Sequence, residues 1–425
     1  MSGGSIRLAL VTMGTLGDLH PMLGLGKAMV ARGHHVTLMC NPVFEGRVRA
    51  QALEFLPVGT EEEQSRTLAH PKLWHPVDGL GVMWRYLLRP ALRPTLDAIQ
   101  QWRLAMPPGT RSLVVATPVA MGARLAQEAW GVPLVSTYTA ATLLRTQTTP
   151  MTLARWRLGG AVPGWVPGLA WRALDRWKLQ PLVLPALNAV RQELGLSPLV
   201  RSVFGDWMHG ETGGLALFPP WFAPAAPDWP GGVQQGDFPL FDDLMPLDAT
   251  LEGFLDRGAP PVVVMPGTGQ LHGADVFRAA LRALPALGLR GVFLGPVPSD
   301  VASQAARADI WCGAHQSFAR LLPRARALVH HAGVGSSAQA LRAGIAQLVW
   351  PQAYDQHDNA WRLEHLGVAR KLPSSLAARG DALQRGLAQL LSSGAPERAR
   401  ALAAERFSGH APDLSNLCRH LERWA

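Results

Sequence analysis

The sequence predicts an α/β protein of two doubly wound domains, each built on a parallel sheet, that face each other across a cleft. A short apolar strand, a glycine turn, a helix and a second strand follow one another at the N-terminus. The same succession returns in the second half of the chain. The length of 425 residues is enough for two domains with cores of their own.

The N-terminal unit opens with an apolar run at residues 6–12, which predicts a buried strand. A turn at residues 13–18 contains two glycines, and residues 21–32 have helical spacing that ends at Gly33. We expect further parallel strands at residues 35–40, 112–116 and 132–136.

The second half repeats this pattern, with a strand at residues 261–265, a glycine turn at 266–269 and a helix at 274–284. We expect its further strands at residues 291–295, 327–330 and 347–350. Residues 222–260 are rich in Pro, Gly and Asp without sustained periodicity, so the domain boundary should lie there. The expected divisions are an N-terminal acceptor domain at 1–235, a C-terminal donor domain at 236–408, and a last helix at 409–425 that packs back on the N-terminal domain.

The composition argues against several classes of protein. The 40 Lys and Arg exceed the 31 Asp and Glu, but the basic residues are scattered, so no nucleic-acid partner is expected. Cys40, Cys312 and Cys418 are too far apart for a disulfide framework or a CxxC metal pair. The N-terminus does not read as a signal peptide, and no run reaches the roughly 18–20 apolar residues of a membrane span. We therefore expect a cytoplasmic protein, with peripheral contact at the inner membrane as the alternative.

The first glycine turn ends in a carboxylate. Its glycines, Gly14 and Gly17, do not fit the G-x-G-x-x-G pattern of dinucleotide sites. Asp18 follows them where the turn becomes a helix. One interpretation is an N-cap carboxylate stabilised by free backbone N–H groups. The other is a general base at the ligand-binding edge of a parallel sheet.

The segment of residues 328–337 predicts an anion site. A strand ends in two histidines, and a glycine-rich turn then opens a helix that bears hydroxyls. Backbone N–H groups, a helix N-terminus and an imidazole can together bind a diphosphate. His330 and His331 cannot bind one metal ion, because adjacent strand residues point to opposite faces, so one should pack and the other should face the cleft.

Two further regions have open interpretations. Asp355 to Asn359 follow the last of these predicted strands and read either as a polar loop with an N-cap or as a grip on vicinal hydroxyls. Tryptophans at 156, 165, 171 and 177 read either as core packing, or as an apolar acceptor pocket or membrane-facing surface.

Together these residues resemble a known family. The spacing from His331-Ala-Gly333-Val-Gly335-Ser336 to Asp355-Gln356-x-x-Asn359 is similar to the nucleotide-sugar signature of the GT-B-fold, family 1 glycosyltransferases. The run Gly14-x-x-Gly17-Asp18-x-x-Pro21 resembles that family's N-terminal signature. The likeness covers essentially the whole chain and implies two Rossmann-like domains. Stretches outside the donor signature resemble the rhamnosyltransferase B chains of rhamnolipid synthesis; they are residues 70–76, 207–209, 217–224, 228–230 and 238–242.

The resemblance implies roles residue by residue. Asp18 matches the catalytic base, while Asp355 and Gln356 match the pair that holds the donor sugar. The donor diphosphate positions are Thr268, His331, Gly333, Gly335 and Ser336. The nucleobase would stack on His315, Phe318 or Trp311, where the chain departs from the family's usual Trp or Tyr. The candidates for acceptor binding are His20, Trp74, Trp84, Trp165 and Trp171.

The implied reaction is inverting transfer of L-rhamnose from dTDP-L-rhamnose to a 3-(3-hydroxyalkanoyloxy)alkanoate, an amphipathic hydroxy-fatty acid. No cofactor or metal is expected, since the sequence shows no Asp-x-Asp pair suited to one. An acceptor-synthesising partner protein is a further expectation. The alternatives are glucosyl or deoxysugar transfer to a sterol, a polyketide or another small aglycone, and a catalytically silent lipid-binding protein on the same fold.

Overall fold

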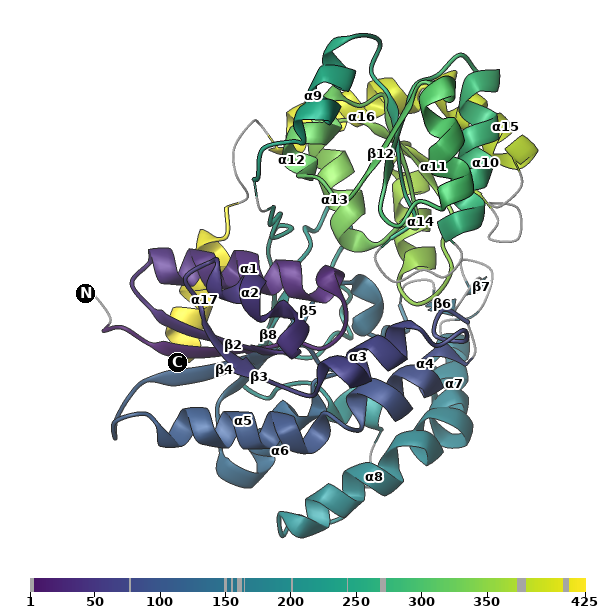
Figure 1. The fold of residues 1–425 in the computed structure, drawn as a ribbon. Coiled ribbons are helices and arrows are strands. Elements are labelled where there is room, and N and C mark those ends of the chain that lie inside the picture. Colours follow the sequence, from purple (N-terminus) through teal and green to yellow (C-terminus); the bar gives the residue numbers. More distant parts are fainter. Residues whose placement is uncertain are drawn as a thin grey trace. The chain divides into compact units, whose positions relative to one another are not determined.

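The computed structural model describes residues 4–75, 78–148, 151–153, 156–158, 163, 165–199, 202–242, 244–267, 273–372, 380–407 and 413–425. The chain forms two compact units (Figure 1). Unit 1 comprises Met1–Pro239 and Asp413–Ala425, and unit 2 comprises Leu240–Pro412. The division after residue 239 lies four residues beyond the boundary expected from the sequence, and the first of these residues, Gly236, still bonds to the first sheet through its N–H to Ala216 O.

Within its described residues, unit 1 contains a seven-stranded parallel sheet in the order β3-β2-β1-β4-β5-β8-β9. The expected strands at 35–40 and 112–116 are confirmed to the residue, and β5 lies two residues later than expected. The strands are β1 (Arg7–Val11), β2 (His35–Cys40), β3 (Glu54–Pro57), β4 (Ser112–Ala116), β5 (Leu134–Tyr138), β8 (Gly213–Ala216) and β9 (Val233–Gln235), beside an antiparallel pair of β6 (Met151–Leu153) and β7 (Trp156–Leu158).

Helices cover both faces of this sheet, with α1 and α17 on one side and α5 and α6 on the other (Figure 1). The helices are α1 (Leu16–Ala31), α2 (Glu45–Arg49), α3 (Glu61–Leu68), α4 (Gly79–Met83), α5 (Leu92–Leu104), α6 (Met121–Trp130), α7 (Trp165–Leu174), α8 (Gln180–Glu193) and α17 (Ser415–Trp424). Short helical turns are η1 (Pro42–Phe44), η2 (Trp84–Leu88), η3 (Ala141–Leu143), η4 (Asp175–Leu179) and η5 (Val203–Trp207).

Helix α1 begins five residues before the start expected at Pro21. Thr15 is its N-cap and accepts a hydrogen bond from the N–H of Gly17, while Asp18 Oδ2 accepts one from the N–H of Thr15 at 2.8 Å. This reciprocal capping box stabilises the first turn, so the helix continues through Pro21 at the loss of one backbone hydrogen bond.

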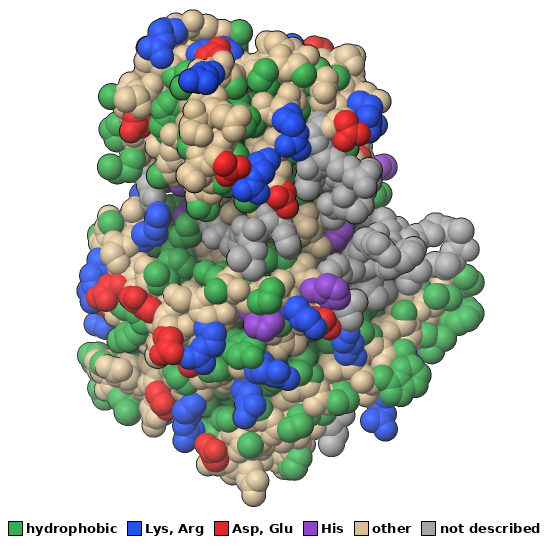
Figure 2. Space-filling model, turned by 45° about the vertical axis from the view of Figure 1, so that its right-hand side comes forward, with side chains coloured by type: hydrophobic (Ala, Val, Ile, Leu, Met, Phe, Trp, Pro, Cys, Tyr) green, Lys and Arg blue, Asp and Glu red, His purple; other side chains and the backbone are tan. Residues whose placement is uncertain are grey.

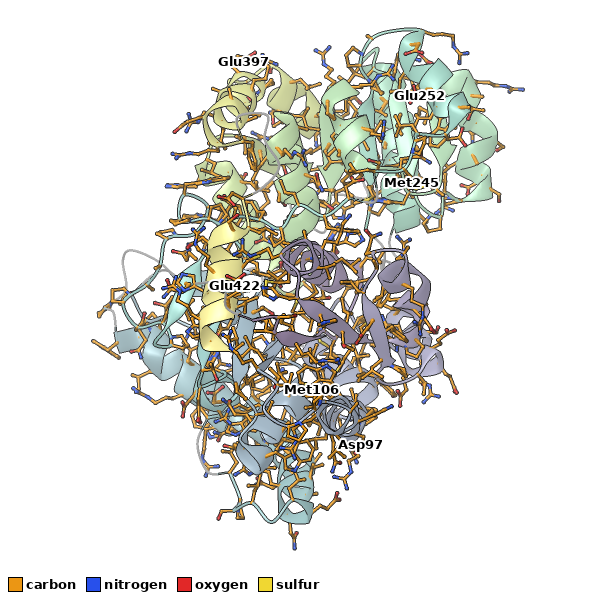
Figure 3. All side chains as sticks on the ribbon, turned by 90° about the vertical axis from the view of Figure 1, so that its left-hand side faces the viewer. Asp97, Met106, Met245, Glu252, Glu397 and Glu422 are labelled. Atoms are coloured by element: carbon orange, nitrogen blue, oxygen red, sulfur yellow. The ribbon has the colours of Figure 1, made fainter. Side chains whose placement is uncertain are left out.

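Helix α17 packs on α1, although nearly 400 residues separate them in sequence. Arg32 Nε donates to Glu422 Oε1 at 2.6 Å, and His34 Nε2 lies 3.0 Å from the same carboxylate oxygen. Figure 3 shows Glu422 on this helix. The C-terminal segment thus belongs to unit 1 from Asp413, four residues later than the expected start at 409.

Within its described residues, unit 2 contains a six-stranded parallel sheet in the order β12-β11-β10-β13-β14-β15, flanked by helices (Figure 1). The strands are β10 (Val262–Met265), β11 (Gly291–Leu294), β12 (Ile310–Gly313), β13 (Ala327–His330), β14 (Ala346–Val349) and β15 (Ala369–Lys371). The helical elements are α9 (Ala249–Asp256), α10 (Gly273–Ala286), α11 (Ser299–Ala305), η6 (Ala306–Ala308), α12 (Phe318–Leu321), η7 (Leu322–Arg324), α13 (Val334–Ala343), α14 (Gln356–His365), α15 (Gly380–Leu391) and α16 (Ala395–Phe407).

The expectation of an α/β protein with two parallel-sheet domains is therefore confirmed. Each sheet has its own apolar core, which is how two neighbouring domains remain distinct. In the described part of the chain, no helix is both long and apolar enough to cross a membrane.

Candidate active site

Several of the predicted site residues lie where the strand order of each sheet reverses. In unit 1, β1 has β2 on one side and β4 on the other; in unit 2, β10 lies in the same way between β11 and β13. At such a switch point the loops leave in opposite directions beyond the carboxyl ends of the strands, which is where open α/β sheets bind ligands. The turn after β1 carries Asp18, and the turns after β10 and β13 carry Gly267 and His331.

Asp18 is not the N-cap, as one interpretation held, but the third residue of α1. Its Oδ2 accepts from the N–H and the hydroxyl of Thr15, at 2.8 and 3.4 Å. The residue as a whole is partly exposed at the end of β1, while its carboxyl group is largely surrounded by protein atoms. The carboxylate therefore takes part in capping and is desolvated.

Burial raises the pKa of Asp18 to about 6, although the Thr15 hydrogen bonds lower it. Desolvation penalises the ionised form of a carboxyl group, so the proton is held more tightly than in water. A carboxylate with a pKa near 6 is ionised at neutral pH and is a stronger base than an ordinary aspartate. This is the property required of a general base.

Two neighbours fix the turn that presents Asp18. Gly14 has a φ of +122°, and a Cβ at that position would lie 2.2 Å from Asp18 Oδ2, so only glycine fits. Gln64 on α3 is almost fully buried and donates from Nε2 to Gly14 O at 2.6 Å. The sequence analysis missed Gln64, because nothing in its local pattern distinguishes it from other polar helix residues.

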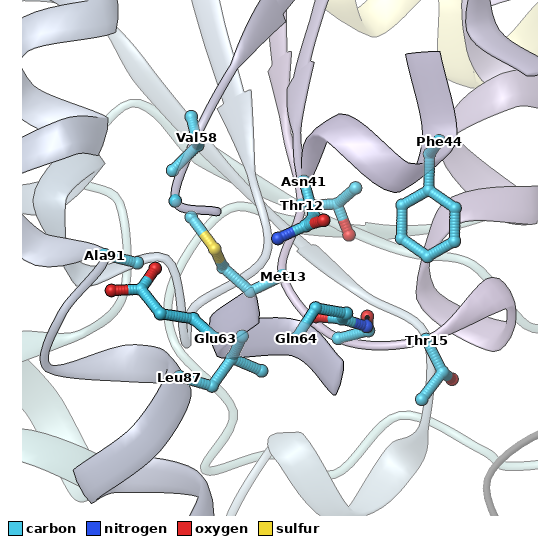
Figure 4. A pocket seen from close by; sticks show the side chains of 12 residues that line it. Thr12, Met13, Thr15, Asn41, Phe44, Val58, Glu63, Gln64, Leu87 and Ala91 are labelled. Atoms are coloured by element: carbon cyan, nitrogen blue, oxygen red, sulfur yellow. Dashed lines mark hydrogen bonds between the residues drawn. The ribbon is translucent and has the colours of Figure 1, made fainter. Parts of the chain in front are cut away.

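A small cavity opens beside this turn in unit 1 (Figure 4). Its apolar wall includes Met13, Phe44, Val58, Leu87 and Ala91, and its polar wall carries Thr12, Thr15, Asn41, Glu63 and Gln64. The cavity has room for little more than one water molecule, so by itself it does not hold an acceptor.

The two histidines after β13 separate as strand alternation predicts. His330 is fully buried; its Nδ1 accepts from the N–H of Ala332 at 3.3 Å, so Nε2 carries the proton and donates to Gln347 Oε1 at 3.0 Å. Burial lowers the pKa of His330 to about 3, which keeps the ring neutral. His330 is a packing residue that positions the turn.

His331 lies instead between two glycines. A Cβ on Gly267 would lie 2.8 Å from its Nδ1, and a Cβ on Gly333 would lie 2.5 Å from its Nε2. Burial lowers the pKa of His331 to about 4, so the ring is neutral at physiological pH. Among the described residues, nothing hydrogen-bonds to its buried Nδ1. The imidazole can therefore offer an N–H to a ligand without first breaking a bond at Nδ1.

The turn then opens helix α13. Gly333 is the N-cap, and no side chain of the described residues caps it. Gly335 is exposed and Ser336 is partly exposed, in the first turn where backbone N–H groups have no helical partner. Unsatisfied N–H groups and the helix dipole favour an anion at this position. Thr268, the remaining residue predicted for the diphosphate, lies outside the described residues.

Asn359 connects the diphosphate turn to the predicted sugar-binding loop. Its Nδ2 donates to Ala332 O at 3.0 Å and to Asp355 Oδ2 at 2.7 Å, and the side chain is fully buried. The first bond holds Ala332, which adopts a positive φ of +66°. Asn359 is thus a positioning residue. The sequence motif contains it, but the motif did not indicate this role.

The predicted pair for the donor sugar is divided. Asp355 is the N-cap residue of α14 but makes no capping bond to the described backbone; it stays partly exposed. Gln356 is buried, and its Oε1 accepts from the N–H groups of Gln352 and Ala353 at 2.8 and 3.3 Å. The oxygen of Gln356 therefore holds the loop, which leaves its amide nitrogen as the group that can contact a sugar.

Three aromatic rings were candidates for stacking on the nucleobase. Phe318 is buried in the core of unit 2, and Trp311 donates from Nε1 to the hydroxyl of Thr250 at 3.0 Å while packing against that core. His315 is exposed and lies 5.2 Å from the Phe318 ring. Of the three, His315 has the most accessible face.

The acceptor candidates do not form one wall. Trp84 was a candidate for the acceptor pocket, but the structure places it in the core of unit 1, where it is buried among other apolar side chains. Trp165 is 62% exposed, which does not fit the wall of a closed channel. Trp171 lies under the Arg145 guanidinium, 4.3 Å from the ring centre, and His20 and Trp74 are partly buried.

Among the described residues, no three His, Cys, Asp or Glu side chains come together in a way that could hold a metal ion. The groups available at the two turns are a basic carboxylate in unit 1, and a neutral imidazole with backbone N–H groups in unit 2. A carboxylate of this kind can accept a proton from a hydroxyl, and an imidazole with such N–H groups can bind a diphosphate.

Comparison with known proteins agrees with this chemistry. The family described as "Glycosyltransferase family 28 N-terminal domain" matches residues 8–149, and "Erythromycin biosynthesis protein CIII-like, C-terminal domain" matches residues 310–420. The chain is 28% identical to an O-mycaminosyltylonolide 6-deoxyallosyltransferase of Streptomyces fradiae, over 99% of this chain and 98% of that protein. It is 33% identical to a vancomycin aglycone glucosyltransferase of Amycolatopsis orientalis, over 51% of this chain and 52% of that protein.

Solved structures show the same fold. Glycosyltransferase VinC in complex with dTDP superposes with a TM-score of 0.69 at 18% identity, covering 99% of both chains. Spinosyn rhamnosyltransferase SpnG with thymidine diphosphate gives a TM-score of 0.66 at 19% identity, covering 98% of this chain and 100% of that one.

The chain is thus similar in sequence and in fold to glycosyltransferases: the two family models match residues 8–149 and 310–420, and the solved structures share its two-domain α/β fold.

Proposed function

We propose that the protein is an inverting glycosyltransferase that moves a sugar from a nucleoside diphosphate to an acceptor hydroxyl, with Asp18 as the base. The observation that carries this proposal is the Asp18 carboxylate, held at the end of β1 by the N–H of Thr15 and with a pKa raised to about 6. A carboxylate used only for capping gains nothing from such desolvation.

In the proposed step, Asp18 accepts the proton of the acceptor hydroxyl while that oxygen attacks the anomeric carbon of the donor sugar. The new C–O bond forms on the face opposite the leaving group, and the bond from the anomeric carbon to the diphosphate oxygen breaks. The nucleoside diphosphate leaves with the electron pair. The step balances without a redox partner and inverts the anomeric carbon.

The leaving diphosphate gains negative charge, and unit 2 carries the donors to meet it. These donors are the imidazole N–H of His331 and the first-turn N–H groups and hydroxyl of α13 at Gly335 and Ser336. Donors that are already oriented stabilise this charge without reorganisation. The reaction requires the two units to hold their substrates together.

For the substrates we propose dTDP-L-rhamnose and a 3-(3-hydroxyalkanoyloxy)alkanoate, so that the product is a mono-rhamnolipid. The support is the resemblance of five stretches outside the donor signature, from residues 70–76 to 238–242, to the rhamnosyltransferase B chains of rhamnolipid synthesis. Thymidine diphosphate in complexes of VinC and of the rhamnosyltransferase SpnG supports this class of donor.

A second candidate is deoxysugar or glucose transfer to a polyketide or sterol aglycone. It is favoured by the names of relatives along most of the chain, among them a 6-deoxyallosyltransferase acting on O-mycaminosyltylonolide and a sterol 3-beta-glucosyltransferase of Arabidopsis thaliana, 25% identical over 83% of this chain and 57% of that protein.

A panel of nucleotide sugars tested against hydroxy-fatty acids, macrolide aglycones and sterols distinguishes the two candidates. For the lipid acceptor, each added CH₂ that becomes buried should tighten binding roughly fourfold, about 0.8 kcal/mol, until further CH₂ groups stay in solvent. Affinity that does not change with chain length, or a preference for a compact aglycone, would overturn the lipid acceptor in favour of the second candidate. Absence of both nucleotide binding and donor hydrolysis would leave the silent lipid-binding protein.

A further inference from the structure

Helix α7 and the turn η4 that continues it carry an exposed apolar stripe that the proposed reaction does not use. Trp165 is 62% exposed, Leu169 47% and Trp177 79%. Of the seven large hydrophobic side chains exposed among the described residues, these three are the only ones on a single continuous helical segment of this length. Hydrophobic side chains gather on the lower right flank in Figure 2, the side on which Figure 1 places α7. We call Trp165, Leu169 and Trp177 the tryptophan stripe.

The opposite face of the same segment is firmly attached to unit 1. Asp175 is buried, and its Oδ1 and Oδ2 accept hydrogen bonds from Arg145 Nη1 at 2.8 and 2.9 Å. The Arg145 guanidinium also lies over the ring of Trp171. Leu179 packs in the core of the unit. The segment therefore has a defined inner face, and the exposure of the tryptophan stripe is a property of an anchored helix.

The exposed charged side chains of this helical segment have one sign. Arg172, Arg176 and Lys178 are all exposed on the same segment. From residue 165 to residue 192 the sequence holds a single acidic residue, Asp175, which is buried and paired with Arg145. Exposed tryptophan beside exposed Arg and Lys, with no exposed acid, complements a surface that is apolar inside and anionic outside.

We propose that the tryptophan stripe docks the protein peripherally on an anionic lipid bilayer, with Trp165, Leu169 and Trp177 in the interfacial region and the three cations on the headgroups. Tryptophan prefers this boundary because its ring is apolar and its N–H is polar. The exposed parts of two tryptophans and a leucine come to a few hundred Å², less than the ~800 Å² that each partner buries in a stable protein interface. The stripe is therefore better suited to a membrane than to a protein.

This inference does not depend on the sugar or the acceptor. It concerns where the enzyme works, and it would give the enzyme access to an acceptor that resides in a membrane. Its failure would leave the glycosyl transfer untouched.

The test is cosedimentation of the full chain with vesicles of equal parts phosphatidylcholine and phosphatidylglycerol, and with vesicles of phosphatidylcholine alone. We expect at least tenfold tighter binding to the anionic vesicles, weakened by salt. Arg172→Gln with Arg176→Gln should weaken that binding roughly 30-fold, because each basic residue near such a surface contributes about 1 kcal/mol. Leu169→Gln with Trp177→Gln should weaken binding at least tenfold to both kinds of vesicle.

Leu104→Gln is the matched control, because Leu104 is 71% exposed but lies at the end of α5. Its binding should equal that of the unmodified protein, and circular dichroism should show every variant folded. No binding of the unmodified protein to anionic vesicles, or equal losses in Leu104→Gln and in the stripe variants, would overturn the proposal. A dimer in sedimentation that the stripe variants dissociate would replace it with an interface between two copies of the chain.

Discussion

The turn after β1 in unit 1 and the turn after β13 in unit 2 are both strand–turn–helix connections. The first carries a carboxylate, and the second carries hydrogen-bond donors. In each, a buried parallel strand ends, a tight turn follows with one residue of positive φ, Gly14 or Ala332, and a helix begins. Helix α1 is capped by its own first residues, since the Thr15 hydroxyl accepts from the N–H of Gly17 and the Asp18 carboxylate accepts from the N–H of Thr15. Helix α13 begins at Gly333 with no cap from the described side chains, and beside it lies the neutral ring of His331.

The difference shows that the residue occupying the helix N-terminus decides the function of the turn. Where the protein supplies its own carboxylate, the helix N-terminus is occupied and the carboxylate becomes a desolvated base. Where the protein supplies only glycine and serine, the N–H groups remain available to an external anion. Substitutions at the two turns should therefore affect different steps, and the five predictions below test this from the largest effect to the smallest.

The largest effect is expected from Asp18→Asn. The amide keeps the shape and an acceptor oxygen for Thr15 but cannot take a proton, so turnover should fall roughly 10²- to 10⁴-fold, as measured by steady-state kinetics. The dissociation constant for the nucleoside diphosphate, measured by calorimetry, should barely change. Near-normal turnover would return Asp18 to a purely capping role.

The next effect is on the other turn. His331→Ala should weaken nucleoside diphosphate binding roughly 10- to 150-fold, because it removes a donor to charged oxygens worth about 1.5–3 kcal/mol. His330→Ala is the matched control: it should lower the melting temperature, since it leaves Gln347 Oε1 without its buried partner, and it should weaken binding much less than His331→Ala does. The assignment of the two faces would be inverted if only His330→Ala weakened binding.

A pH profile separates the turns without substitution. The raised pKa of Asp18 predicts that kcat/KM falls below pH 6 and is roughly tenfold lower at pH 5 than at pH 8, because only the ionised carboxylate accepts a proton. The lowered pKa of His331, about 4, keeps that ring neutral over the same range, so nucleotide binding should stay flat.

The same shift has a consequence for stability. A carboxyl whose pKa is higher in the folded state stabilises the fold below its unfolded pKa, and this contribution is lost as pH rises through about 6. Asp18→Asn should therefore be more stable than the unmodified protein at pH 8, by about 1–3 kcal/mol, with the difference shrinking below pH 6. Urea unfolding at pH 8 and pH 5 measures it; an equal difference at both pH values would contradict the burial effect.

The smallest effects come from a pair of glycines. Gly14→Ala should unfold at lower urea and lose turnover, because its φ is positive and the new Cβ would displace the Asp18 carboxylate. Gly335→Ala meets nothing within 4 Å in the first turn of α13, so it should stabilise the protein by about 0.5–1 kcal/mol and preserve nucleotide binding. A loss of binding in Gly335→Ala would mean that the anion approaches the backbone more closely than a methyl group allows.

Much of the fold followed from local pattern. The strands at residues 35–40, 112–116 and 327–330 are found as predicted, because buried parallel strands are short apolar runs between turn residues. The start of α1 was missed because Pro21 marks a first helical turn, and the capping box that overrides this depends on two side chains three residues apart. The helical turns at η2, η4 and η5 were missed as well, since no single-sequence pattern distinguishes them.

By itself, the sequence determined the α/β class, the two glycine turns and the candidate residues Asp18, His331 and Asp355, because strand ends, glycines and polar residues are local features. Only the tertiary structure decided what each residue does. It buried His330 and left His331 available, it turned the oxygen of Gln356 inward, and it placed Trp84 in the core and Trp165 in solvent. The physical reason is that burial, and with it the pKa and availability of a side chain, depends on which distant segments pack against it.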